Sequence, residues 1–395
     1  MAEYDSRQIM YPISTAELER RWAAARAMMA EKGLDCLIMQ GITQYLSGYV
    51  RWFTDFPTLN SYPITVIFPR DGEMTLITNG APPKPGYPPV EAMRGIKAAY
   101  AEPFFPAFNY SVLVDAEIAA GTLREEGAKV VGVLGENLFP ASMYNYISKT
   151  IPGIELVEAA DYIDGIKAVK SEEELAMIRK CIEIQDLGMA EVPKLLRPGM
   201  REFELRAALE HMMTDLGSEE KWIMIGSCNP GGLSHQKMHH VQNRVIEKGD
   251  EVCVMIEVNG PGGYYGEIGR QYCMSKPSAE LKHIWNEAVE AQALSASMLK
   301  PGAKPSEILK ANNEFLTSRG YPPEIRLYAH GQGYDLIERP ALQPDETMLI
   351  QEDMNIAVHP KVIIPTGQAY CCDNYLVTKE GGVRLHKTPL ELIEV

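Results

Sequence analysis

The sequence lacks several features that mark common functional classes. It has no glycine-rich GxGxxG pattern, which leaves a dinucleotide site without support, and no CxxC pair among its seven cysteines. Its net charge of −15 disfavours nucleic acid or an anionic membrane as the main partner. No apolar run reaches transmembrane length, and the first residues lack the basic and apolar regions of a signal peptide. We therefore expect a cytoplasmic protein with reduced cysteines.

What the chain does contain is an ordinary globular composition, 46% hydrophobic and 23% charged, over 395 residues. Short apolar stretches alternate with helical ones through the first part, which predicts an α/β domain with a largely covered sheet over residues 1–164. A helix capped by Ser171 then opens a second domain, residues 165–395. In the first domain, strands are expected at residues 34–40, 61–78 (as a pair) and 130–135, and helices at 14–31 and after Pro140.

An internal repeat organises the second domain. Residues 196–205 match residues 299–308 without a gap, and their shared Pro-Gly turns are 103 positions apart. Each copy follows a charged helical stretch and precedes an amphipathic helix and a pair of strands. The strands are expected within residues 251–274 for the first copy and at 354–364 and 369–378 for the second. A duplicated half would place equivalent strand pairs around a pseudo-twofold axis and bring their polar side chains into one cleft.

The first of these strand pairs carries two carboxylates. Residues 251–258 and 264–274 predict strands joined by a glycine-rich turn, with Glu257 inside an apolar run and Glu267 on the return strand. Hairpin pairing would bring the two glutamates face to face. Burying a carboxylate is costly unless it is paired, protonated or bound to a metal ion. The alternative is a half-exposed hairpin in which Glu257 faces solvent.

Histidines supply the other candidate groups. Three of them, His235, His239 and His240, lie in a polar loop before the hairpin, where one could act as an acid or base. His330 lies between small residues, which allows a ligand to approach the backbone closely, and His359 lies in an apolar strand. Solvated or hydrogen-bonded core histidines are the alternatives at these positions.

The repeat aligns Glu257 with His359 and Glu267 with Asp373, so polar groups of both halves are expected at one site. Together with His330 they offer ligands for one or two divalent ions, Zn, Mn or Fe. Without a metal, the same five residues would form a hydrogen-bonding box for a cationic or zwitterionic small molecule. The residues alone leave both possibilities open.

Two further segments stand out. A loop rich in aromatics contains Arg51, Trp52 and Phe56 and is expected to contact a substrate or a partner. The alternative is that these side chains pack on their own domain. The adjacent Cys371 and Cys372 are expected to be packing residues, with metal ligation as the alternative.

From about residue 163 onward the chain resembles the pita-bread family that includes creatinase, prolidase, aminopeptidase P and methionine aminopeptidase. The motifs that carry the resemblance are IKAVKSEEELAMIR, RPG…E at 197–204, KGDEVCVMIEV, GYYGEIGR, AHGQGYDLIERP and DNYLVTKEGG. The N-terminal α/β domain matches the longer members, so the resemblance covers essentially the whole chain. It implies an α/β N-terminal domain followed by an α+β pita-bread domain with an internal pseudo-twofold duplication.

The same resemblance points to an altered ligand set. Metallopeptidase members bind two divalent ions through Asp, Asp, His, Glu and Glu. The corresponding positions here are Glu257, Glu267, His330, His359 and Asp373. Only the histidine keeps its type. The peptidase motif HGxGxxxHExP has a second histidine where this chain has Ile337, while Glu338 and Pro340 are kept. These departures disfavour ordinary Xaa-Pro peptidase activity.

Creatinase and ectoine hydrolase are nearest in character, because they share the fold, lack the metal set and hydrolyse C–N bonds in small zwitterions. We therefore predict a creatinase-like hydrolase that cleaves a C–N bond of a small polar or zwitterionic substrate by acid/base histidine catalysis. On this reading His239 is the acid/base, with His240 left open by a one-residue gap, and Glu257 orients or deprotonates water or anchors the substrate cation. His330 and His359 bind a carboxylate or the oxyanion, and Asp373 fixes a histidine tautomer.

In this subgroup the N-terminal domain of a partner subunit closes the active site, so the resemblance implies a homodimer. The predicted substrate-binding residues are Arg51, Trp52, Phe56, His240, Tyr265, His359 and Glu338. The alternative is a metal-dependent enzyme, Xaa-Pro dipeptidase-like or dimethylsulfoniopropionate lyase-like, that uses the five altered ligand positions. A non-catalytic binding role, as in ribosome-associated and histone-chaperone relatives, is the third alternative.

Overall fold

Most of the chain is described by the computed structural model, without the side chain of His239: residues 8–46, 48–80, 88–108 and 113–395. The chain divides into two compact units, Met1–Lys167 and Ala168–Val395, and each is described by itself. The domain boundary predicted from the sequence, between residues 164 and 165, remains a prediction. Within the described ranges, no helix is long and apolar enough to cross a membrane.

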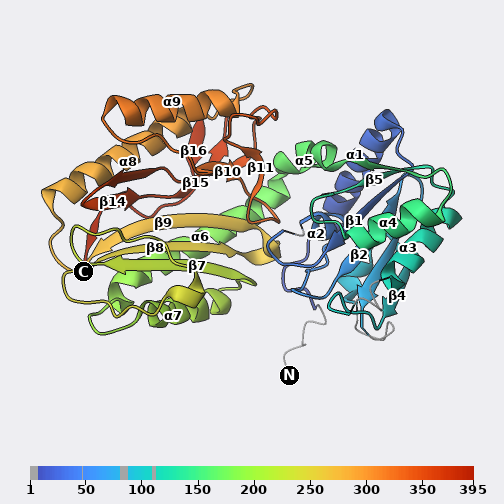
Figure 1. The fold of residues 1–395 in the computed structure, drawn as a ribbon, viewed down its shortest axis with the longest axis horizontal. Coiled ribbons are helices and arrows are strands. Elements are labelled where there is room, and N and C mark those ends of the chain that lie inside the picture. Colours follow the sequence, from blue (N-terminus) through green and yellow to red (C-terminus); the bar gives the residue numbers. More distant parts are fainter. Residues whose placement is uncertain (1–7, 47, 81–87, 109–112) are drawn as a thin grey trace. The chain divides into compact units, whose positions relative to one another are not determined.

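The first unit is built on a six-stranded sheet in the order β4-β3-β2-β1-β5-β6 (Figure 1). Its strands are β1 Cys36–Gly41, β2 Ile64–Pro69, β3 Met74–Asn79, β4 Ile96–Glu102, β5 Val130–Val133 and β6 Glu155–Glu158. Its helices are α1 Thr15–Lys32, α2 Gly48–Thr54, α3 Val114–Glu125, α4 Ala141–Thr150 and α5 Ala160–Ala168, with a 3-10 turn, η1 Val90–Met93. Parallel and antiparallel pairs are mixed in the sheet, and the predicted α/β arrangement is confirmed.

Local sequence explains where α1 begins and ends. The side chain of Ser14 accepts a hydrogen bond from the backbone N–H of Glu17 at 3.0 Å, which satisfies a donor that the first helical turn leaves free. Gly33 ends the helix with φ 71°, a left-handed conformation that glycine adopts without steric cost. The helix predicted from this capping pattern is confirmed.

The aromatic segment expected to be a contact loop is instead helix α2 with the residues that follow it, and this corrects the prediction. Its side chains are buried: Arg51 is 7%, Trp52 1% and Phe56 5% exposed. The ring of Trp52 packs edge-on against that of Phe53, with centroids 4.9 Å apart. Burial removes this aromatic area from water, which favours a short helix packed inside the unit over an exposed loop. The alternative of packing on its own domain fits this burial, and the substrate-binding role expected for Arg51, Trp52 and Phe56 stays a prediction.

The second unit combines a five-stranded, a four-stranded and a two-stranded sheet, ordered β11-β10-β12-β15-β16, β17-β9-β8-β7 and β13-β14 (Figure 1). Helices α6 and α7 pack on the four-stranded sheet, and α8 and α9 contribute to the core of the five-stranded one. The helices are α6 Glu172–Leu195, α7 Glu202–Asp215, α8 Ala279–Ser297 and α9 Pro305–Ser318, with 3-10 turns η2 His239–Val241 and η3 Pro261–Gly263. The strands are β7 Lys221–Cys228, β8 Glu251–Asn259, β9 Tyr265–Cys273, β10 Ala329–Gly331, β11 Glu338–Ala341, β12 Asn355–Val358, β13 Lys361–Ile364, β14 Gly367–Tyr370, β15 Asp373–Val377, β16 Gly382–Arg384 and β17 Ile393–Glu394.

The internal repeat is visible as the same turn in both halves. Gly199, between α6 and α7, and Gly302, between α8 and α9, adopt left-handed conformations with φ 90° and 86°. The N–H of Gly199 donates to the backbone oxygen of Ile246, and the N–H of Gly302 donates to that of Ile350, both at 2.8 Å. Each turn thus joins its helix pair to the segment ahead of the next strands in the same way. The predicted duplication is confirmed.

The central hairpin has the predicted register. β8 and β9 pair antiparallel, and Glu257 lies directly opposite Glu267. Both strands are buried along their whole length, so the alternative of a half-exposed hairpin does not apply. The connecting turn contains Gly262 and Gly263 with φ 73° and 83°, which side-chain-bearing residues rarely adopt.

The second strand pair is broken where two continuous strands were predicted. β12 pairs with β15, and beyond the break β13 pairs with β14. The break falls at His359-Pro360 on one side and at Cys371-Cys372 on the other. Because proline has no N–H to donate to the ladder, Pro360 cannot continue a central strand. His359 therefore lies at an interruption of the sheet, where its side chain is not fixed by regular pairing.

Replacing Gly302 by alanine should destabilise the fold by about 1–2 kcal/mol, because an L side chain is strained at φ 86°. Among the described atoms, none lies within 4 Å of the position of the added Cβ, so the cost comes from the backbone alone. Chemical denaturation followed by circular dichroism measures the change. Gly121→Ala is the control, because this glycine lies in helix α3 with open space around it and alanine there should stabilise by up to about 1 kcal/mol. Equal shifts in the two variants would contradict the expectation.

Candidate functional site

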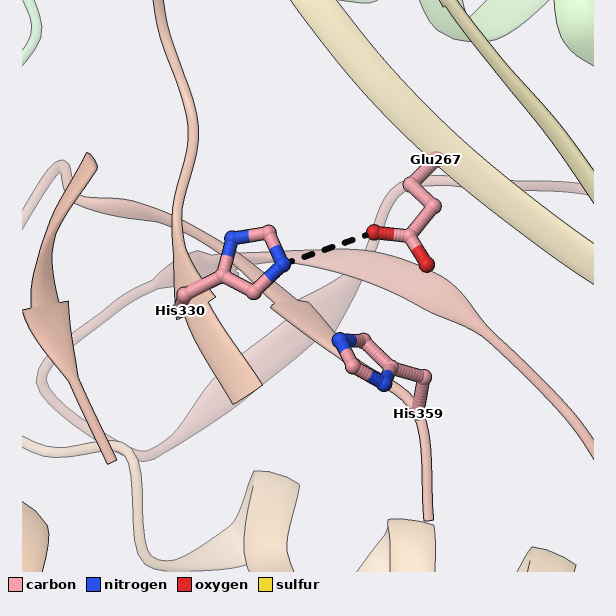
Figure 2. Close-up of side chains that lie close together, drawn as sticks. All are labelled: Glu267, His330 and His359. Atoms are coloured by element: carbon pink, nitrogen blue, oxygen red, sulfur yellow. Dashed lines mark ion pairs between the residues drawn. The ribbon is translucent and has the colours of Figure 1, made fainter. Parts of the chain in front are cut away.

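Three buried side chains from separate parts of the second unit converge on one point. Glu267 extends from β9, His330 from β10, and His359 follows β12 (Figure 2). One carboxylate oxygen and one nitrogen from each ring all lie within 4.8 Å of one another. The exposed fractions are 1%, 3% and 7% respectively, so the group is shielded from bulk water.

Contact between the two halves of the repeat creates this cluster. Gly269 of β9 pairs with Cys372 across the sheets, and a Cβ on Gly269 would lie 2.4 Å from the ring of Tyr370. Only glycine allows this approach. It brings the Tyr370 hydroxyl to 3.0 Å from Oε1 of Glu267, to which it donates a hydrogen bond. The first half thus supplies the carboxylate of the cluster, and the second half supplies both histidines.

His330 presents one nitrogen to the cluster. Its Nδ1 lies 3.0 Å from the backbone oxygen of Gly331. Since a carbonyl oxygen can only accept, Nδ1 carries a proton and donates it to this oxygen, and Nε2 is the nitrogen that faces the cluster. Nε2 lies 3.6 Å from Oε2 of Glu267. A proton or a metal ion between Nε2 and this carboxylate oxygen would stabilise their approach.

His359 is the member of the cluster whose ring nitrogens lack hydrogen-bond partners among the described residues. Both of these nitrogens are buried. Its ring centroid lies 5.3 Å from that of His330 and 6.1 Å from that of Tyr370. Burial lowers the pKa of His359 to about 4, so the ring is neutral near pH 7 and has a free lone pair. Unpartnered buried polar atoms are costly and call for an explanation, such as a ligand.

The two glutamates of the hairpin differ in protonation state. Burial and then the neighbouring Glu267 carboxylate raise the pKa of Glu257 well above its ordinary value. Burial opposes ionisation of Glu267 as well, but its electrostatic interactions with His359 and His330 and the hydrogen bonds from Cys372 and Tyr370 lower its pKa. Glu257 therefore holds a proton beside an ionised Glu267, and its Oε1 accepts a hydrogen bond from Nε2 of Gln332 at 3.0 Å.

The donor set of Glu267, His330 and His359 fits one divalent metal ion. Two imidazoles and a carboxylate form the protein ligand set of many catalytic zinc sites, and of iron(II) sites with open positions. Metal-binding histidines usually donate their other N–H to a carbonyl or carboxylate, as Nδ1 of His330 does toward Gly331. The unpartnered nitrogens of His359 supply the remaining donor.

Asp373 does not join this cluster in the described part of the chain, which corrects its assignment as a metal ligand; the histidine that it approaches is His386, whose Nδ1 lies 3.6 Å from its Oδ1. Its Oδ1 lies 2.7 Å from NH2 of Arg270 in an ion pair in which both side chains are 0% exposed. Its Oδ2 accepts a second hydrogen bond, from Gln292 at 3.2 Å. Successive side chains of an extended segment point to opposite faces, so Asp373 points away from the side that Cys372 occupies.

Sequence reasoning missed Tyr370 as a member of the site and considered Cys372 only as a packing residue or a metal ligand. Tyr370 donates to a carboxylate oxygen of Glu267, and the thiol of Cys372 donates to the backbone oxygen of Glu267 at 3.5 Å. Burial and then the charge of Glu267 raise the pKa of Cys372 well above its ordinary value, so it is a neutral thiol. The spacing of two between Tyr370 and Cys372, which places both on one face of an extended strand, is the pattern that would have indicated them.

The remaining predicted residues of this domain lie in different settings. Tyr265 is buried on β9, two positions before Glu267 and so on the same face of the strand. Glu338 forms a buried ion pair with Nζ of Lys170 at 2.8 Å, which gives its carboxylate a structural partner. Ile337, in place of the second histidine of the peptidase motif, is 44% exposed.

The histidine loop before the hairpin is placed only in part. His239 and His240 begin the short helix η2, but the His239 side chain lies outside the described residues. His240 is exposed, and Nδ1 of His235 lies 3.3 Å from Nζ of Lys361. The acid/base role assigned to His239, with His240 as the alternative, therefore stays a prediction.

Comparisons with known proteins agree with this architecture. The model of metallopeptidase family M24 matches residues 176–390. The chain is 30% identical to a Xaa-Pro dipeptidase of Pyrococcus horikoshii over 274 residues. This aligned region covers 68% of this chain and 76% of that protein. It is 23% identical over 403 residues to a creatinase of a Bacillus species, over 93% and 90% of the two chains. A Xaa-Pro dipeptidase structure from Bacillus anthracis superposes with a TM-score of 0.78 over 96% of this chain and 100% of that one, at 22% identity.

The chain therefore belongs to metallopeptidase family M24 and is a hydrolase with the pita-bread fold. The family and fold expected from the sequence motifs are confirmed. Creatinase-like specificity is not confirmed, because dipeptidases match at higher identity and the metal-dependent alternative fits at least as well.

A buried network beside the cluster predicts how stability depends on pH. Nδ1 of His386 accepts from the N–H of Asn374 at 3.2 Å, and its Nε2 lies 2.9 Å from Oε1 of Gln185, so the ring is neutral. Burial and then the charges of Arg270 and Arg384 lower the pKa of His386 well below its ordinary value. The unfolded chain binds a proton near pH 6.5 that the folded chain excludes. Stability should therefore fall below that pH by up to about 1.4 kcal/mol per unit.

Denaturant unfolding of the wild type and of His386→Gln between pH 5 and 8 measures this effect. The stability of the wild type relative to the variant should decline as the pH falls. His283→Gln, which changes an exposed histidine of α8, should follow the wild type at every pH. A constant difference between the wild type and His386→Gln across the range would refute the assignment.

Proposed function

We propose that this hydrolase cleaves a C–N bond in a small polar or zwitterionic substrate and holds one divalent metal ion through Glu267, His330 and His359. The observation that carries the proposal is the convergence of two imidazoles on a carboxylate, with both nitrogens of His359 lacking a partner among the described residues. Of the two mechanisms considered from the sequence, we therefore favour the metal-dependent one.

The ion would polarise the carbon–oxygen bond under attack and lower the pKa of water. Hydrolysis adds the oxygen of water to the substrate carbon, breaks the C–N bond and delivers a proton to the leaving nitrogen. Glu257 holds a proton next to the cluster, and Gln332 orients its carboxyl group. We assign Glu257 first to donate its proton to the leaving nitrogen and then, as a carboxylate, to take up the proton that water releases, which restores its starting state.

We propose that the substrate is smaller than those of the peptidase relatives or is bound differently. Ile337 occupies the position of the second histidine in the peptidase motif and cannot donate a hydrogen bond to a reacting oxygen. Xaa-Pro dipeptides, named for the Pyrococcus relative, and small zwitterions, as for the Bacillus creatinase, are the compounds to assay first. We also retain the proposals that the protein is cytoplasmic, which follows from its cysteine usage, and that it forms a homodimer, which follows from the family resemblance.

Elemental analysis of the purified protein tests the metal site directly. We expect about one equivalent of Zn, Mn or Fe, with activity lost on chelation and restored by the ion. His359→Leu should lose the metal, whereas His283→Leu, an exposed histidine, should keep it. Without metal, His359→Leu should be at least as stable as the wild type, because it removes two unpartnered buried nitrogens. Comparing the melting temperatures of the metal-free wild type and His359→Leu tests this expectation without an activity assay.

A metal-free protein that remains fully active after chelation would overturn the proposal and favour histidine acid/base catalysis. In that event His239→Ala should reduce turnover by about 10²–10⁴-fold with little change in melting temperature. His240→Ala provides the matched comparison, because the two residues are adjacent candidates for the same role.

A further inference from the structure

Lys361 lies at the border of the candidate site. It is the first residue of β13 and pairs directly with Tyr370 of β14. Directly opposed residues of an antiparallel pair place their side chains on the same face, so Lys361 lies beside Tyr370. Tyr370 donates to Glu267, and its ring centroid lies 6.1 Å from that of His359. The backbone of Lys361 therefore lies next to that of Tyr370 and two residues along the chain from His359.

Its ammonium forms no ion pair with a carboxylate in the described part of the chain, and Glu324, whose charge acts on it from further away, is already paired with Arg326. The Lys361 side chain is half-buried, and its hydrogen-bond partner is Nδ1 of His235, a neutral acceptor 3.3 Å away. Burial raises the pKa of the nearby Cys253 thiol to about 12, so it supplies no negative charge. A partly buried ammonium without a carboxylate loses hydration and gains no ion pair. Such a group can bind an anionic ligand.

The second cation nearby is already neutralised. Arg326 donates to the backbone oxygen of His359 at 3.3 Å, but its guanidinium also forms two side-chain hydrogen bonds to the carboxylate of Glu324. It supports the segment that carries His359 and leaves the net positive charge on Lys361. A single ammonium suits a singly charged carboxylate, whereas phosphate sites usually add an arginine fork or several backbone N–H groups.

We propose that Lys361 determines specificity by binding a carboxylate of the substrate, so that the compound cleaved is a small amide with a free carboxyl group near the scissile C–N bond. The proposal rests on the hydrolase function proposed above and names its substrate class. His235, which accepts from Lys361, keeps the ammonium in place beside Tyr370.

The test compares acids with their amides. Pairs such as L-alanyl-L-proline and L-alanyl-L-prolinamide are titrated into the purified protein by calorimetry, and KM and kcat are measured wherever a compound is turned over. The wild type should bind the acid at least about tenfold more tightly than the amide. Lys361→Met should weaken binding of the acid by about tenfold to a hundredfold and leave the amide unchanged, since a hydrogen bond to a charged group is lost.

Two variants control for indirect effects. Lys361→Arg keeps the charge and should retain part of the preference for the acid. Lys282→Met removes an exposed lysine of α8 and should behave as the wild type. If the wild type binds no acid more tightly than its amide, or if Lys361→Met weakens both forms equally, the inference is wrong. If the preference depends on Lys361 but no compound is hydrolysed, the hydrolase function proposed above fails and the carboxylate site stands.

Discussion

The burial of two carboxylates opposite each other in an apolar hairpin is the constraint on which the candidate site depends. Two like charges cannot both be ionised at low cost in such surroundings. The structure accommodates one of them: Glu257 keeps a proton and accepts from Gln332, while Glu267 is ionised and receives a hydrogen bond from Tyr370. The neighbours are thus arranged for a single negative charge, and they favour whatever positive group binds next to it.

That arrangement exists only when both halves of the repeat are folded against each other. The glutamates belong to the first half, whereas Tyr370 and the two histidines belong to the second. The close approach at Gly269 leaves no room for a side chain, so the contact is fixed by steric fit. Formation of the site is therefore coupled to the packing of the two sheets, and residues outside the cluster can affect it by altering that packing.

Much of this could be predicted from the sequence, because the relevant patterns are local. Alternation and a glycine-rich turn give the register of Glu257 and Glu267, and the repeated Pro-Gly turn gives the duplication. The face occupied by Asp373 could not be predicted in the same way. Pro360 interrupts one strand and the chain breaks opposite it, so the position of each side chain beyond the break depends on tertiary contacts. A shift of one residue exchanges Cys372 for Asp373 at the cluster. The helical, buried state of Arg51 and its aromatic neighbours likewise follows from packing, which a polar-aromatic pattern does not specify.

The charge of the donor set argues for one metal ion. The family pattern of Asp, Asp, His, Glu and Glu offers four carboxylates to two divalent ions. In this chain, the corresponding face carries neutral His359 and the neutral thiol of Cys372, and Asp373 is paired with Arg270. Glu257 and Glu267 are the carboxylates that remain, and in the metal-free state one of them is protonated. Two divalent ions would leave at least two positive charges unbalanced in a buried site, which is strongly unfavourable. A single ion beside Glu267, with Glu257 free to exchange a proton, matches the charge that these residues can supply.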